Sequence, residues 1–449
     1  MLLRLAALAA LFGFLFGFDE GVIAGALPFI GKQFDISPAA EGFMTAAVPL
    51  GAVAGAIIAA AWSDRFGRRR VLLACSVLFG VGSIICGITP GIAVLTLARI
   101  LLGIAIGASA LAAPMFLAEL APAARRGAIV SAFQLMITVG ILSSYLVGLG
   151  LADSGHWRIM LTLGVVPAAV TFAGMIGADE SPRWLVLQRR NDEAAAVIGR
   201  LQPELGTAQV GRMVDEIDDR RNAVGEAPGW KAFLAPGVRG ITIFAMMAFL
   251  LQQVSGINAV IYYAPRILHS GGYGTTSEQL LGTVGIGAIN VIMTFVAIAT
   301  VDRLGRRPLF IFAFVGTALS LVVIAWAMGS GAPPAIGLIG LFAYIAVFAM
   351  SLGPLPWLYM SELFPLQLRS RGMALASVSN WSFNFLVVFL FPVATNWLGT
   401  KATMLVFAAF CAAGAVYAVI WAPETKGESL EALETRLANR PVGARAAGD

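Results

Sequence analysis

The stretch Asp64-Arg65-Phe66-Gly67-Arg68-Arg69 returns later in the chain as Asp302-Arg303-Leu304-Gly305-Arg306-Arg307. A second string, Glu119-Leu120-Ala121-Pro122 followed by Arg126, returns as Glu362-Leu363-Phe364-Pro365 followed by Arg369. Each copy lies between long apolar runs. The sequence therefore indicates one unit that is present twice, and duplicated halves of a membrane protein commonly enclose a path for a substrate.

The composition indicates a membrane protein. Hydrophobic residues make up 59% of the 449 residues and charged residues 12%, which is about half the charged share of a soluble protein. The apolar runs are about 20 residues long, as in membrane-spanning helices, whereas barrel strands would alternate over about ten residues. The N-terminal run could be a signal peptide, but it resumes after Asp19 and Glu20, so we interpret it as the first span.

We expect an all-α integral membrane protein with twelve transmembrane helices in two pseudo-symmetric six-helix bundles. The expected spans are residues 5–30, 42–62, 71–88, 92–118, 128–150, 158–177, 240–268, 279–300, 308–328, 335–361, 372–397 and 402–421. The predicted domains are an N-terminal bundle (1–177), a linker with short amphipathic helices (178–239), a C-terminal bundle (240–421) and a tail (422–449).

The basic residues predict how the chain is oriented. The loops after spans 2, 4, 8 and 10 hold eleven arginines, whereas the loops at the other end hold only Lys32, Arg158 and Lys401. Loops rich in Lys and Arg stay in the cytoplasm. We therefore expect these four loops, the linker and both termini on the cytoplasmic side of the cell membrane. The net charge of +5 is explained in this way and does not indicate binding of nucleic acid.

Few charged residues lie inside the spans. The first half has Asp19, Glu20 and Arg99, and the second half has Arg266 near the end of a span. An ion in hydrocarbon is costly, so these side chains must face protein or water. We expect Asp19 and Arg99 to pair across a cavity, with Glu20 either behind the residues that line the cavity or at its rim. The pair could be a static salt bridge that fixes the helices, or, as we favour, a switch that opens when Asp19 takes up a proton.

The spans also carry amides and aromatic residues. A single amide in a span is usually explained by a hydrogen bond between helices. Several amides beside tryptophans favour a ligand with hydroxyl groups, because amides both donate and accept hydrogen bonds and Trp offers an apolar face to a sugar ring. Gly256 and the Gly353-Pro354 pair predict breaks in spans 7 and 10, which membrane depth tolerates only beside a cavity.

The repeated arginine-rich strings predict a gate of salt bridges between helices at the cytoplasmic face, which could hold one conformation and open in another. The alternative is that these arginines only set the orientation. The residues assigned to the gate are Asp64, Arg65, Arg68, Glu119, Arg126, Glu180, Asp302, Arg306, Glu362 and Arg369.

Signals for an enzyme, a metal site or a cofactor are missing from the sequence. No Gly-x-x-x-x-Gly-Lys-Ser/Thr string is present, so no ATPase is expected. His156 and His269 are isolated, and Cys75, Cys86 and Cys411 lack the spacing of metal ligands.

The chain resembles the sugar porter branch of the major facilitator superfamily over essentially its whole length. Besides the two repeated strings, the matches are Phe16 to Asp19, Arg99 with Gly103, Pro114 to Glu119, Glu180 to Trp184, Gln252 to Tyr263, Gly353 to Trp357 and Pro423 to Gly427. Asp179 departs from the family pattern, which has Pro at this position, and we expect this change to affect where span 6 ends.

The resemblance implies the major facilitator fold, a central sugar site and alternating access. It implies sugar contacts at Gln134, Gln252, Gln253, Asn258, Asn290, Trp357, Asn380 and Trp381, with Phe16, Tyr262 and Asn384 nearby. Proton-linked bacterial relatives carry Asp at the position of Asp19, whereas facilitative glucose transporters of animals carry Asn. The chain is similar to the proton-linked kind, so Asp19 and Arg99 are the expected proton-coupling residues.

The sequence thus predicts a monomeric transporter in the lipid bilayer that imports a neutral monosaccharide such as glucose, galactose or xylose. The proton is the expected coupling ion, and no cofactor is expected. A facilitative uniporter for a sugar or polyol, and a sugar sensor that does not transport, are the alternatives.

Overall fold

The computed structural model describes residues 2–120, 126–224, 229–364 and 368–426, and within these ranges it contains helices and no strands. The predicted twelve membrane spans are confirmed, because the described residues contain twelve helical segments that are long and apolar enough to cross a membrane. In the first half these are formed by α1 (Leu2–Phe34), α2 (Pro38–Phe66), α3 (Arg68–Ile88), α4 (Ile92–Leu120), α5 (Arg126–Gly150), α6 (Trp157–Thr162) and α7 (Val165–Ile176).

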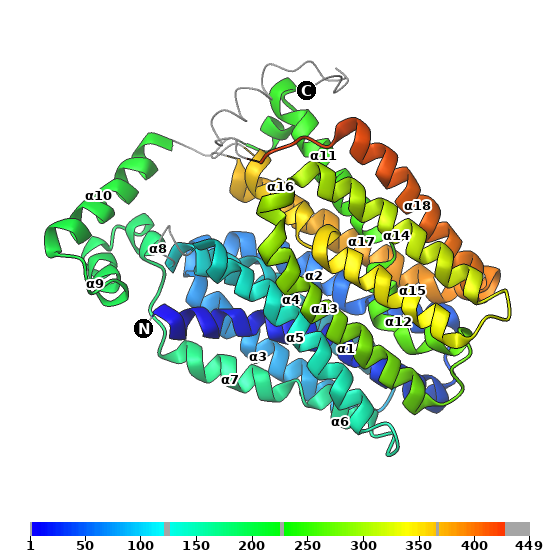
Figure 1. Ribbon diagram of the computed structural model, residues 1–449. Helices are drawn as coiled ribbons and strands as arrows, with labels where there is room; N and C mark the ends of the chain where they lie inside the picture. The colour runs from blue at the N-terminus through cyan, green and yellow to red at the C-terminus, as the bar shows by residue number, and fades with distance from the viewer. Residues whose placement is uncertain (1, 121–125, 225–228, 365–367, 427–449) are drawn as a thin grey trace.

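The second half repeats this arrangement with two interrupted spans. Its helices are α11 (Pro236–Val254), α12 (Ile257–Ser270), α13 (Thr276–Leu304), α14 (Arg306–Ala327), α15 (Pro334–Val347), the π-turn η3 (Phe348–Leu352), α16 (Leu355–Leu363), α17 (Arg369–Leu398) and α18 (Thr400–Trp421). The helices lie side by side along one common direction (Figure 1).

The segment between the halves folds into α8 (Pro182–Leu187), α9 (Asn191–Leu201), α10 (Thr207–Val224) and the 3-10 helix η2 (Trp230–Leu234). The first three lie outside the bundle, at the end where α1 begins (Figure 1). Ala194, Val197, Ile198 and Leu201, which the sequence places on one apolar face, are all buried in α9. We call this the arginine-rich end, because it carries Arg68 and Arg306, and we call the other the opposite end.

Both predicted breaks are present. Between α11 and α12, Gly256 has a φ of 91°, in the left-handed region that favours glycine. In span 10 the π-turn η3 ends at Leu352, and Pro354, which has no N–H to continue the helical ladder, precedes α16. The sequence therefore places irregular backbone at the middle of the bundle, where the candidate site lies.

Contacts between the halves extend from the middle of the spans to the opposite end. At that end, Arg266 on α12 donates a hydrogen bond of 2.9 Å to Glu41 on α2. Deeper in the bundle, the Tyr145 hydroxyl on α5 donates to the Ile261 carbonyl on α12 at 2.9 Å. These contacts hold the two halves together on that side of the protein.

Candidate substrate and proton site

Asp19 and Arg99 lie opposite one another in the first half, as the sequence predicts. Asp19 is 3% exposed and Arg99 is fully buried. The Nη1 atom of Arg99 on α4 lies 3.9 Å from Oδ1 of Asp19 on α1. Oδ2 of Asp19 has no hydrogen-bond partner among the described residues. The pair is thus enclosed but loosely joined, at the outer limit of an ion-pair distance.

The Arg99 guanidinium also contacts the backbone of α2. Its Nε atom donates to the Met44 carbonyl at 3.1 Å, and its Nη2 atom donates to the Thr45 carbonyl at 3.5 Å. Pro49 lies four residues after Thr45 and has no N–H, so the helix cannot use the Thr45 carbonyl. Arg99 therefore has acceptors within α2 that do not depend on the charge of Asp19.

Three predicted amides form a chain in the second half. The Nδ2 group of Asn258 on α12 donates to Oε1 of Gln253 at 2.7 Å, and Nε2 of Gln253 donates to Oδ1 of Asn380 on α17. Nε2 of Gln252 donates to the Leu352 and Gly353 carbonyls at 2.8 and 3.2 Å, at the break between η3 and α16. Both helix breaks thus contribute to one polar cluster.

Two buried polar atoms next to this cluster have no partner among the described residues. They are Nε1 of Trp381 and Oδ1 of Asn384, both on α17. The Trp381 ring lies 5.3 Å, centroid to centroid, from Phe16 on α1, so it bridges the two halves. A buried donor and a buried acceptor without partners suit a ligand that has hydroxyl groups.

The other predicted sugar contacts are spread over several helices. Tyr262 on α12 is 1% exposed and Asn290 on α13 is 8% exposed. Gln134 on α5 and Trp357 on α16 are half-buried. The ring of Trp357 packs edge-on against Phe249 with centroids 4.7 Å apart.

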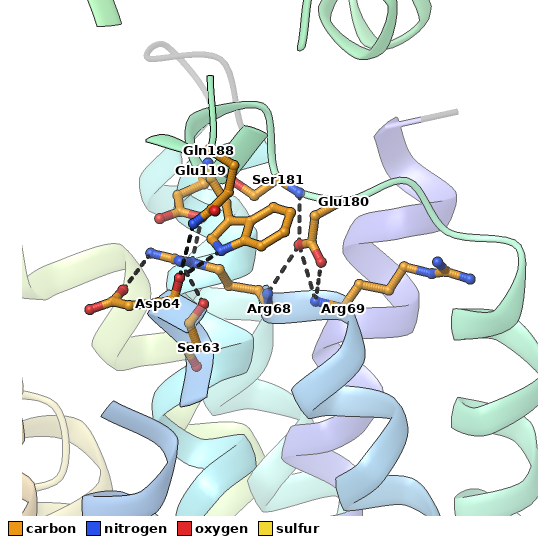
Figure 2. A network of polar contacts seen from close by, with 9 residues as sticks. Ser63, Asp64, Arg68, Arg69, Glu119, Glu180, Ser181 and Gln188 are labelled. Atoms are coloured by element: carbon orange, nitrogen blue, oxygen red, sulfur yellow. Dashed lines mark hydrogen bonds and ion pairs between the residues drawn. The ribbon is translucent and has the colours of Figure 1, made fainter. Parts of the chain in front are cut away.

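The arginine-rich end of the first half holds four of the predicted gate residues in one network (Figure 2). Arg68 lies 3.1 Å from Glu119 on α4 and 3.4 Å from Asp64 on α2, and it donates to the Ser63 carbonyl at 2.9 Å. Glu180 accepts from the backbone N–H groups of Arg68 and Arg69, both at 3.1 Å. These bonds join helices within the first half.

The second half repeats this network. Arg306 on α14 donates to Glu362 on α16 at 2.9 Å. Glu424 accepts from the backbone N–H groups of Arg306 and Arg307 at 2.9 and 3.1 Å. The Thr425 hydroxyl donates to Glu362 at 2.5 Å. Glu424, which the sequence analysis did not assign to the gate, therefore takes the place that Glu180 has in the first half.

Four predicted gate residues are not seen in the salt bridges and hydrogen bonds of these two networks. Arg65 is exposed and lies over the Phe66 ring at 5.2 Å instead of joining the described network. The side chains of Arg126, Asp302 and Arg369 lie outside the described residues. Their assignment stays a prediction.

The sequence analysis missed two features. It noted Arg266 as an isolated charge, but not its partner Glu41, although both lie near span ends on the same side. It also missed Trp184, whose Nε1 donates to the Asp64 carbonyl at 2.9 Å and ties the linker to the network. Asp179, the departure from the family pattern, pairs with Arg200 of α9 at 2.8 Å.

Burial and hydrogen bonds have opposite effects on the pKa values of Glu180 and Glu424, which both lie outside the spans. Burial raises the pKa of Glu180, although N–H groups of Ser181, Arg69 and Arg68 oppose this shift. Burial also acts to raise the pKa of Glu424, but four backbone N–H groups outweigh it and the pKa is lowered. Across the described part of the chain, no group of three His, Cys, Asp or Glu side chains could hold a metal ion.

Residues 5–437 match the family model described as "Sugar (and other) transporter". The chain belongs to this family. The predicted family is thereby confirmed. The chain is 38% identical to the galactose-proton symporter of Escherichia coli K12, covering 96% of this chain and 93% of that protein. It is also 35% identical to the glucose transporter GlcP of Staphylococcus epidermidis, covering 98% and 97%.

Solved structures agree with this assignment. The xylose transporter XylE from E. coli, in a partially occluded inward-open conformation, matches with a TM-score of 0.85 at 28% identity, covering 95% of this chain and 99% of that one. XylE bound to 6-bromo-6-deoxy-D-glucose, described as a major facilitator superfamily proton:xylose symporter, matches with a TM-score of 0.80 at 29% identity, covering 97% and 99%. The predicted major facilitator fold is confirmed.

Proposed function

We propose that this protein is a secondary active transporter that imports a neutral monosaccharide together with a proton by alternating access. The observation that carries the proposal is the Asp19–Arg99 pair, enclosed in the first half, beside a second half that presents amides and two unpartnered polar atoms. A symporter of galactose and protons and transporters of glucose and xylose are among its relatives.

The substrate site is assigned to both halves. Gln134, Phe16 and the amides of α11, α12, α13 and α17 line the sugar path, with Trp357 and Trp381 as ring contacts. The unpartnered N–H of Trp381 and carbonyl of Asn384 are the atoms with free capacity for a hydroxyl. Arg99 as the cation beside the site favours a neutral sugar, because an anionic sugar would need more cationic contacts.

The proton site works through Asp19. When Asp19 is ionised, it and Arg99 attract each other across 3.9 Å. Protonation removes this attraction, yet Arg99 keeps the Met44 and Thr45 carbonyls as acceptors. These hydrogen bonds reduce the cost of leaving Arg99 without its ionised partner, and loss of the attraction allows α1 to move relative to α4.

The arginine-rich end is assigned to the cytoplasm, with both termini and the linker on that side. In this orientation the structure is closed toward the outside by contacts such as Glu41–Arg266. The salt bridges around Arg68 and Arg306 then serve as parts of a cytoplasmic gate. The two bundles are assigned to residues 1–177 and 240–421, and one chain in the cell membrane forms the complete path.

Uptake of radiolabelled sugar into proteoliposomes tests this function. With an imposed proton gradient, the sugar should reach a higher concentration inside than outside, and a protonophore should abolish the difference. Asp19→Asn should lose accumulation but keep exchange of labelled for unlabelled sugar. Uptake that only equilibrates, with and without the gradient, would replace symport by facilitated uniport.

A further inference from the structure

Glu20 is a buried carboxyl that the mechanism above leaves without a role. It is 6% exposed, and no hydrogen bond or ion pair joins it to any described residue. Its neighbour in the chain, Asp19, has Arg99 as its ion-pair partner. Two adjacent carboxyls therefore lie near one guanidinium, which contacts only one of them.

The two carboxyls face different parts of the protein. Asp19 lies against α4, within the first half. Glu20 lies one helical turn after Phe16, on the α1 face whose Phe16 ring contacts Trp381 of the second half. The helix α12 of the second half also packs against α1. Glu20 therefore lies on the side of α1 that faces the second half.

The charged and titratable groups around Glu20 give it no ion-pair partner, because the cation among them, Arg99, pairs with Asp19. They are Asp19 on its own helix, Arg99 on α4, Tyr145 on α5 and Tyr262 on α12. Arg266, further along α12, is paired with Glu41. An ionised Glu20 in this position would be a nearly buried charge without an ion-pair partner, which favours the protonated carboxyl while the halves are closed.

We propose that Glu20 is a proton-binding residue that controls closure at the opposite end. When α12 moves away from α1, water reaches the carboxyl and its proton leaves to that water. Closure requires the proton to return from the same side. That this side is the outside of the cell rests on the proposed function. Because the proton goes back to the side from which it came, Glu20 adds nothing to the number of protons carried per sugar.

Spin-label distance measurements on the full-length protein in liposomes test the proposal. Labels are placed at Gly91→Cys in the first half and Gly274→Cys in the second, because a Cβ at either position meets no atom within 4 Å. The native Cys75, Cys86 and Cys411 are buried and do not compete. The background is Asp19→Asn, so that Asp19 cannot titrate.

The ratio of open to closed molecules should rise with pH. Release of one proton on opening gives a slope of up to about tenfold per pH unit between pH 5 and 8. Adding Glu20→Gln should make the ratio independent of pH. Glu20→Thr is the second variant, for use if the Gln variant folds poorly, and it should have the same effect. Asp35→Asn, an exposed carboxyl at the end of α1, should keep the slope.

A slope that persists in both Glu20 variants, or a ratio without any slope in Asp19→Asn, would overturn the proposal. The measurement needs no sugar flux. Failure to accumulate sugar would therefore refute the proposed function alone, whereas the pH dependence of the label distances decides the role of Glu20.

Discussion

Glu180 and Glu424 hold equivalent positions in the two halves. Each carboxylate accepts hydrogen bonds from the first two backbone N–H groups of a helix, α3 for Glu180 and α14 for Glu424. These N–H groups have no partner within their own helix, and the helix dipole favours a negative charge there. The same interaction thus closes each half at the arginine-rich end.

The opposite pKa shifts of these two residues predict opposite effects of pH. The pKa of Glu180 is raised above its usual 4.5, so its contribution to stability is complete in acid and is lost as the pH rises through the raised value. The pKa of Glu424 is lowered, so its contribution is present above 4.5 and is lost as the pH falls.

Thermal unfolding of Glu180→Gln and Glu424→Gln between pH 4 and 8 measures this difference. Relative to wild type, Glu180→Gln should gain stability as the pH rises. Glu424→Gln should lose about 1–2 kcal/mol near neutral pH, from its charge-assisted bonds, and recover in acid. Parallel pH profiles for the two variants would contradict the assignment.

Gly67 and Gly305 are predicted to resist substitution for two reasons. Their φ values are 94° and 87°, and an added Cβ would lie 2.2 Å from Oε2 of Glu180 and 2.9 Å from Oε2 of Glu424, respectively. Alanine at either position should cost about 1–3 kcal/mol, and more at Gly67 because its contact is closer.

A double variant separates the two causes. In a Glu180→Ala background the contact is gone, so Gly67→Ala should cost less there than in the wild type, and only the backbone strain should remain. Gly177→Ala at the end of α7, where a Cβ meets nothing within 4 Å, should be nearly neutral. Equal costs for Gly67→Ala in both backgrounds would exclude the contact as a cause.

The Glu41–Arg266 pair is predicted to stabilise the state that is closed at the opposite end. Its side chains are 12% and 40% exposed and lie on different halves. Glu41→Gln or Arg266→Gln should raise the population of the open state about fivefold, corresponding to ~1 kcal/mol for a partly exposed pair. Distances between spin labels at the opposite end measure the populations.

A double-mutant cycle should show that the two substitutions are not additive, because each removes the same interaction. Asp179→Asn serves as the matched control. It breaks a pair of similar length, 2.8 Å, that joins α9 to the end of α7 and does not cross between the halves. A shift of the open population in this control would mean that the assay reports general destabilisation.

The sequence predicted the spans and the Asp19–Arg99 pair because long apolar runs, and rare charges within them, can be recognised from the amino-acid sequence alone. It could not predict that Arg99 also contacts the Met44 and Thr45 carbonyls, because a contact with the backbone leaves no mark on the residue types involved. Pro49 was a signal, since a proline inside a span frees a carbonyl one turn earlier.

The pairing at the ends of the spans was harder to predict. Glu424 lies in the string that resembles the family, yet its equivalence to Glu180 depends on the fold placing both beside a helix N-terminus. Glu41 and Arg266 are separated by 225 residues in the sequence, and only the packing of α2 near α12 brings them together. Such distant pairs require the three-dimensional arrangement of the halves.

Trp381 is predicted to bind the sugar through its N–H group as well as its ring. The ring is 2% exposed and Nε1 has no partner among the described residues. Trp381→Phe keeps an aromatic face toward Phe16 but removes the donor. Sugar affinity should fall about tenfold, or ~1.4 kcal/mol, while the unfolding temperature without sugar should change little, because no hydrogen bond within the protein is lost.

Ligand-induced thermal stabilisation across a panel of hexoses and pentoses measures this affinity, because binding to the folded state raises the unfolding temperature by mass action. Trp397→Phe is the matched control, since that ring is 82% exposed and lies at the end of α17, away from the amide cluster. The sugar concentration that gives half of the maximal thermal stabilisation should be the same for Trp397→Phe and the wild type. Equal midpoints for Trp381→Phe and wild type would mean that the indole N–H does not contact the sugar, and that Trp381 acts only as an apolar surface between the halves.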